Sequence, residues 1–128
     1  MTQFVGIIHK EKSSDYGVIF PDFPGCISAG KTMQEAYEMG REALRGHIAT
    51  MLEYGEALPK KPMTLDEAKK HEFAKNAETF FMVDAYLPSK KKRTNITLDV
   101  DVIKEINLVT DNLSAFLQEA AIEKLQHR

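Results

Sequence analysis

The feature that most constrains this chain is a short alternating stretch near its C-terminal end, followed by two amphipathic segments. Between residues 93 and 98 the side chains alternate, with Arg93, Asn95 and Thr97 on one face and Ile96 centred on the other. A period of two is typical of a β-strand. Apolar side chains then recur at helical spacing over residues 100–109 and again from residue 113 onward. The sequence therefore predicts a strand, a helix and a second helix.

Two polar residues are predicted to start these helices. Asp99 stands directly before the first helical stretch, where a carboxylate accepts hydrogen bonds from free backbone N–H groups. The pair Asp111-Asn112 interrupts the apolar pattern, and either Asn112 or Ser114 is suited to cap the second helix.

Residues 89–128 are too few to fold alone as this unit. A single strand leaves backbone N–H and C=O groups unpaired, and a segment of about 40 residues rarely buries an adequate core by itself. A second copy related by a two-fold axis pairs the two strands antiparallel and closes one core from four helices. We therefore expect a homodimer through this segment, and association of two dimers into a tetramer is a further option.

The paired strands would form a ribbon suited to the DNA major groove. Its outward side chains, Arg93, Asn95 and Thr97, can bond guanine, adenine and a thymine methyl or acceptor group respectively. Three lysines precede the strand and are expected to contact phosphates: Lys90, Lys91 and Lys92. The alternative is that the amphipathic strand and helices serve dimerisation only.

This segment resembles the ribbon-helix-helix family of dimeric transcriptional repressors in the stretches RTNITLD, VDVIKEIN and NLSAFLQEA. The resemblance implies that the outward strand residues read bases in double-stranded operator DNA. It also implies that the start of the second helix binds a phosphate through backbone N–H groups. By position, that phosphate site falls on Asn112, Leu113 and Ser114.

Composition places the remainder of the chain among ordinary globular domains. Of 128 residues, 43% are hydrophobic and 28% are charged. No apolar run approaches the roughly 20 residues of a membrane span, no signal peptide is expected, and the lone Cys26 fits a reducing cytoplasm. Residues 1–88 hold 10 basic and 13 acidic side chains, so the basic character is confined to residues 90–93.

Residues 1–88 are predicted to form an α+β domain, separated from the C-terminal domain (89–128) by the polar stretch after Pro88. Strands are predicted at 3–9, 16–20, 26–29 and 78–87. A long helix begins after Thr32, in a Thr-x-x-Glu capping box, and ends near Gly55; a second such box at Thr64 begins a short helix. We expect a sheet covered on one face by the long helix.

The stretch YGVIFPDFPGCISAGKTMQEAYEMGREAL, within residues 3–87, resembles the N-terminal domain of HicB-type antitoxins. The resemblance implies a degenerate RNase H-like fold without nuclease activity. It also implies a partner, a HicA-type ribonuclease toxin that cuts messenger RNA and whose active site the antitoxin covers. The C-terminal domain would bind the operator of its own operon, so that neutralisation and autorepression belong to separate domains.

The rigid turn in this motif is the predicted toxin contact. An acidic domain attracts the basic surface that a ribonuclease needs to hold RNA, and the turn offers a preformed surface with Phe23 as an apolar anchor. The alternative is that the same side chains only pack the turn. The residues of this predicted contact are Pro21, Asp22, Phe23 and Pro24.

Catalysis is not expected. A two-metal nuclease needs several converging carboxylates, and only Asp84 lies within a predicted strand. The four histidines lack ligand spacing, and Cys26 has no second cysteine. We therefore expect no enzyme activity, cofactor or metal. The alternative function is a stand-alone ribbon-helix-helix repressor whose N-terminal domain senses a small ligand.

Overall fold

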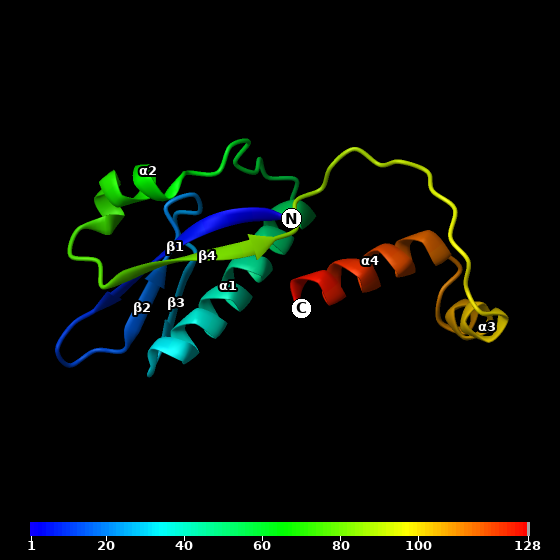
Figure 1. Cartoon of the computed structure of the whole chain (residues 1–128), viewed down its shortest axis with the longest axis horizontal. Helices are drawn as coiled ribbons and strands as arrows, with labels where there is room; N and C mark the ends of the chain where they lie inside the picture. Colours follow the sequence, from blue (N-terminus) through cyan, green and yellow to red (C-terminus); the bar gives the residue numbers. More distant parts are fainter. Residues whose placement is uncertain (128) are drawn as a thin grey trace. The chain divides into compact units, whose positions relative to one another are not determined.

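The computed structural model describes residues 1–127 of the chain. It divides into two compact units, Met1–Leu87 and Pro88–Arg128. Figure 1 shows that the first unit holds a sheet with helices, whereas the second is helical. The predicted domain boundary lies one residue further along the chain than this division.

The first unit contains one antiparallel sheet of four strands. These are β1 (Thr2–Lys10), β2 (Tyr16–Ile19), β3 (Ile27–Gly30) and β4 (Thr79–Ala85). Their order is β3-β2-β1-β4, which leaves β3 and β4 at the two edges. All four predicted strands are confirmed, with boundaries that differ by no more than two residues. The α+β class is therefore confirmed, whereas the relation to a degenerate RNase H fold stays a prediction.

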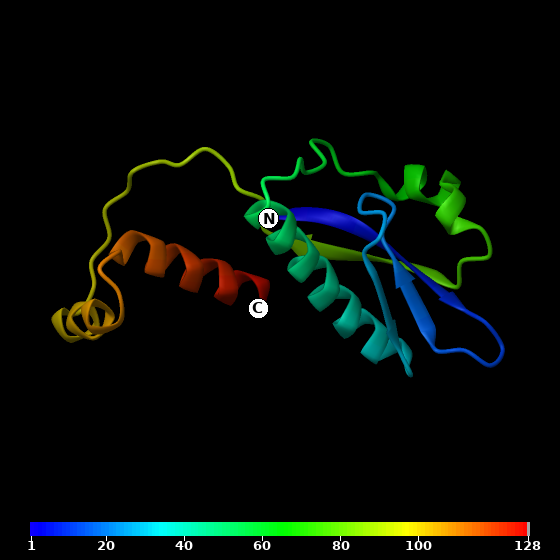
Figure 2. The same ribbon diagram turned by 180° about the vertical axis from the view of Figure 1, so that it is seen from behind.

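Helix α1 (Met33–Glu53) lies across one face of the sheet, as Figures 1 and 2 show from opposite sides. It begins where the Thr32 hydroxyl accepts a hydrogen bond from the Glu35 N–H at 3.1 Å. The other half of the predicted capping box, the Glu35 carboxylate bonding back to Thr32, is not formed. The side chains that α1 buries recur every fourth residue, at Ala36, Gly40, Leu44 and Ile48.

Gly40 allows this helix to approach the sheet closely. A Cβ atom at this position would lie 3.0 Å from Val18 Cγ1 and 3.1 Å from Phe81 Cζ. The place of Gly40 within the apolar stripe of this helix predicts such close packing on a sheet, and the structure confirms it. At its other end α1 stops as predicted, because Gly55 adopts a φ of 68° and its N–H donates to Leu52 O.

The second face of the sheet is also covered, which the sequence analysis did not predict. Val5 and Ile7 point away from the α1 side and are nonetheless fully buried. The segment with α2 (Leu65–Lys70) and the short 3-10 helix η1 (Glu72–Ala74) lies here, since His9 Nε2 is 2.7 Å from Phe73 O. The capping box predicted at Thr64 starts α2 with both of its hydrogen bonds in place.

The second unit contains α3 (Val100–Val109) and α4 (Leu113–Gln126). Asp99 stands at the start of α3 as predicted, but its side chain makes no capping hydrogen bond. Of the two candidate caps for α4, the structure uses Asn112, whose Oδ1 accepts from Ala115 N–H at 3.0 Å. The strand predicted at 93–98 is not formed in this single chain, where residues 88–99 carry no regular structure.

Candidate functional site

The predicted base-reading residues lie in the extended segment before α3. Arg93, Asn95 and Thr97 are all exposed, as are the lysines at residues 90–92. The described part of the second unit contains no strand that could pair with this segment, so the segment makes no β-ladder hydrogen bonds within that unit. The structure thus keeps every predicted DNA-contacting side chain of residues 90–97 accessible without arranging them into a reading surface.

The start of α4 offers fewer phosphate-binding groups than the resemblance implied. The Asn112 N–H donates to Thr110 Oγ1 at 3.1 Å, so this group is already occupied. The backbone N–H groups of Leu113 and Ser114 have no hydrogen-bond partner among residues 1–127. Two of the three predicted donors therefore remain available for an anion at this helix terminus.

The second unit buries very little of its apolar surface. Among its described residues only Ile106, at 6% exposure, belongs to the buried class. In contrast, Leu108 is 79% exposed, Val109 72% and Ile96 62%. Large exposed apolar side chains in this number are typical of an interaction surface.

The turn between β2 and β3 is rigid and partly internal. Two hydrogen bonds fix it, from Phe23 N–H to Phe20 O and from Cys26 N–H to Phe23 O, both at 3.0 Å. Gly25 has a φ of 94°, a conformation that only glycine adopts readily. The turn is therefore held by its own backbone, as its two prolines and glycine predict.

The four predicted toxin-contact residues differ in how deeply they are buried. Pro21 and Phe23 are buried, with the Phe23 ring in edge contact with Phe4 at 4.9 Å. Asp22 is half-buried and its Oδ2 accepts a hydrogen bond from Met63 N–H at 3.0 Å. Pro24 is exposed. The ring of Phe23 thus packs against the core, and a toxin contact at this turn stays a prediction.

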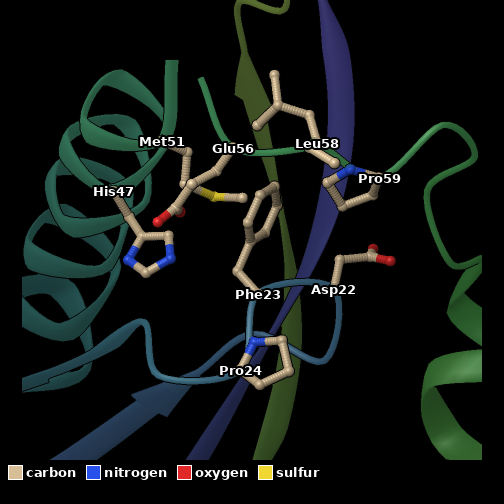
Figure 3. A pocket seen from close by; sticks show the side chains of 9 residues that line it. Asp22, Phe23, Pro24, His47, Met51, Glu56, Leu58 and Pro59 are labelled. Atoms are coloured by element: carbon tan, nitrogen blue, oxygen red, sulfur yellow. The ribbon is translucent and has the colours of Figure 1, made fainter. Parts of the chain in front are cut away.

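A hollow of about 510 Å³ lies beside this turn, and we refer to it as the turn pocket. It is lined by residues 22–24, by His47 and Met51 of α1, and by residues 56–59 of the following loop. Figure 3 shows the Phe23 ring at its centre, with His47 and Glu56 on one side and Asp22 and Pro59 on the other. The sequence does not predict this pocket, because no local pattern links the turn to the loop after α1.

The contact made by Arg45 is a second feature that the sequence does not predict. Its Nη2 and Nε donate to the backbone carbonyl of Asp84, at 3.0 and 3.3 Å. Burial lowers the pKa of Arg45, and nearby Arg41 lowers it further, while Asp84 opposes the change. The guanidinium stays charged, because the ordinary pKa of arginine lies far above neutrality. The contact ties α1 to the edge strand β4.

The described part of the chain holds no cluster of metal-ligating side chains. Among residues 1–127, no three His, Cys, Asp or Glu side chains converge on a position that suits a metal ion. Burial raises the pKa of the Cys26 thiol to about 11, so this side chain is protonated and unreactive near neutral pH. Over the same residues, no helix has the length and apolarity that crossing a bilayer requires.

Comparison with known proteins identifies the family. The sequence model described as "HicB_like antitoxin of bacterial toxin-antitoxin system" matches residues 4–121. A 14.9 kDa protein from the rep-hol intergenic region of Haemophilus phage HP1 is 36% identical over 123 residues, covering 90% of this chain and 92% of that protein.

Solved structures agree with this sequence match. The antitoxin HicB of Burkholderia pseudomallei is similar with a TM-score of 0.61 and 32% identity, covering 98% of this chain and 99% of that one. A chain of the HicA3 and HicB3 toxin-antitoxin complex shares the fold at a TM-score of 0.56 and 23% identity, covering 67% of this chain and 100% of its own. The chain described here therefore belongs to the HicB-like antitoxin family of bacterial toxin-antitoxin systems.

Proposed function

We propose that this protein is an antitoxin that binds and occludes a HicA-type mRNA-cleaving toxin, and that its dimer binds the operator of its own operon. The observation that carries the first part is the family match over residues 4–121, together with the likeness to HicB of B. pseudomallei over almost the whole chain. The protein would act by binding alone, in the cytoplasm where messenger RNA and operator are found, without cofactor or metal.

The first unit is the proposed toxin-binding part. Its residues carry a net charge of −3 over positions 1–88, opposite to the charge that a ribonuclease needs to hold RNA. Its sheet is covered on both faces and has a closed core. A rigid unit of this kind loses little conformational freedom on binding, so contact energy converts into affinity efficiently. Occlusion of the toxin's RNA site would then require no chemistry.

The second unit is the proposed dimerisation and DNA-binding part. Its exposed apolar side chains include Ile96, Leu108 and Val109, and burying one such side chain fully contributes roughly 1.5–3 kcal/mol. A second copy supplies the strand that pairs with residues 93–98 and the helices that cover this surface. Pairing would place Arg93, Asn95 and Thr97 of both copies side by side on a ribbon that fits the major groove.

Three measurements test this function. Coexpression with the small protein of the neighbouring reading frame should give a stable complex whose mass is measured after copurification, and should relieve any growth arrest that the small protein causes. Upstream DNA should be shifted by the purified protein with a strong dependence on salt, because lysine and arginine contacts displace counterions. A protein that neither binds its neighbour's product nor relieves its toxicity would refute the antitoxin proposal.

A further inference from the structure

The turn pocket combines an apolar interior with an acidic rim. Phe23 and Met51 supply apolar surface, and none of the nine lining residues is a lysine or arginine. Asp22 and Glu56 supply two carboxylates on opposite sides, as Figure 3 shows. A hollow with this composition favours an occupant that has a cationic head and an apolar stem.

The backbone positions of Asp22 and Glu56 are set by the fold before any partner arrives. Asp22 uses Oδ2 for Met63 N–H, and Oδ1 has no hydrogen-bond partner within residues 1–127. Glu56 follows Gly55, whose positive φ ends α1, and the Glu56 N–H donates to Met51 O at 2.8 Å. The Glu56 side chain is exposed and makes no hydrogen bond to the described residues. Acceptors are therefore available on both sides of the pocket without rearrangement of the turn or of the helix end.

We propose that the turn pocket receives an arginine side chain of the toxin, held between Asp22 and Glu56. This inference rests on the proposed antitoxin function and names its contact surface. Arginine fits better than lysine, because a planar guanidinium can bond carboxylates on both sides and also stack on an aromatic ring such as that of His47. Its methylene stem would lie along Met51. The toxin must be basic to hold RNA, so arginine is available on its surface.

The position of the pocket explains why the turn motif is built as it is. Pro21 and Phe23 are buried and hold the turn on the core, and the Phe23 ring also lines the pocket together with the less buried Asp22 and Pro24. The predicted toxin contact thereby shifts from the Phe23 ring to the pocket formed around it. A preformed pocket costs little ordering entropy when a partner's side chain enters.

The test compares two substitutions in the whole chain, each of which replaces one glutamate by glutamine. Glu56→Gln removes a carboxylate of the pocket, and Glu42→Gln removes one from the exposed surface of α1 outside it. Affinity for the purified product of the neighbouring reading frame is measured by calorimetry. We expect Glu56→Gln to weaken binding about tenfold or more and Glu42→Gln to change it less than about threefold, because a lost partner matters most where a charge is paired.

A double-mutant cycle identifies the occupant. Each arginine of the toxin is replaced by methionine, and one replacement should weaken binding to the wild type but add nothing further to Glu56→Gln. Asp22→Asn serves as a second variant, scored only if its melting temperature shows that the turn remains folded. Equal affinities for wild type and Glu56→Gln, or the absence of any coupled arginine, overturn the inference.

Two other outcomes distinguish a failure of the proposed antitoxin function from a failure of the proposed pocket occupant. If the wild type does not bind the neighbouring product at all, the proposed function itself fails. If millimolar L-arginine stabilises the wild type but not Glu56→Gln, while toxin affinity is the same for both, the pocket holds a small ligand and the inference is wrong.

Discussion

The open apolar surface of the second unit leads to a sharp prediction at Ile96. In the predicted strand 93–98 this side chain is on the face opposite to Arg93, Asn95 and Thr97, and it is 62% exposed in the single chain. If two copies pair as an antiparallel ribbon, Ile96 of each copy becomes buried beneath it. Ile96→Ala should therefore weaken dimerisation while leaving the first unit folded.

The size of the effect follows from the exposed area. Full burial of an isoleucine side chain contributes roughly 1.5–3 kcal/mol, and with 62% still exposed, about 1–2 kcal/mol remains to be gained per copy. Two-fold symmetry counts this gain twice, which gives about 2–4 kcal/mol per dimer. The dimer dissociation constant should rise by roughly 30- to 700-fold.

Sedimentation velocity over a concentration series measures this constant, and Asn95→Ala is the matched control. In the predicted ribbon Asn95 is on the outward face, opposite to Ile96, so its replacement should leave dimerisation unchanged. An Ile96→Ala protein that dimerises like the wild type would refute the ribbon. Weakened dimerisation for Asn95→Ala alone would instead show that the strand is shifted by one residue, since a one-residue slip exchanges the two faces.

Three further predictions concern DNA binding, packing and the buried thiol. Asn95→Ala should cost about 1–3 kcal/mol of discrimination between operator and unrelated DNA in band-shift titrations. Gly40→Ala should destabilise the first unit in urea by up to about 2 kcal/mol, because the packing cost of a Cβ against Val18 and Phe81, roughly 1–3 kcal/mol, exceeds the gain of about 1 kcal/mol in helix propensity. Gly46→Ala, with open space around it in the same helix, should instead stabilise by about 0.5–1 kcal/mol. The pKa of Cys26 is raised to about 11 in the folded state, so as the pH rises the unfolded chain loses its thiol proton first. The free energy of unfolding should therefore fall between about pH 9 and 11. Cys26→Ala should remove that part of the pH dependence.

Most of the first unit could be predicted because its signals are local. Alternation of side chains marked the strands, and Thr32, Thr64 and Gly55 marked helix ends at the positions where the structure has them. These signals act within a few residues, so no knowledge of the tertiary fold was needed to interpret them. Even the role of Gly40 followed from its place on the buried stripe of a helix.

The contacts that the sequence did not reveal all join distant segments. Arg45 donates to the backbone carbonyl of Asp84. Every residue has such a carbonyl, so the side chain at position 84 gives no sign that it is the acceptor. The turn pocket combines residues 22–24 with the loop after α1, and the cover over the second face depends on His9 meeting Phe73. Such pairs become visible only when the chain is folded, because nothing in their local sequence depends on the partner.

At residues 93–98 the sequence predicts a strand that the single chain does not form. Its alternation is a local signal as clear as those of the first unit, yet residues 88–99 form no strand in the single chain. A strand needs hydrogen-bonding partners, and the described part of the second unit contains only the helices α3 and α4. The same unit leaves Leu108 and Val109 more than two-thirds exposed. A missing backbone partner and a missing apolar cover thus occur together in one segment, and a second copy of that segment would supply both at once.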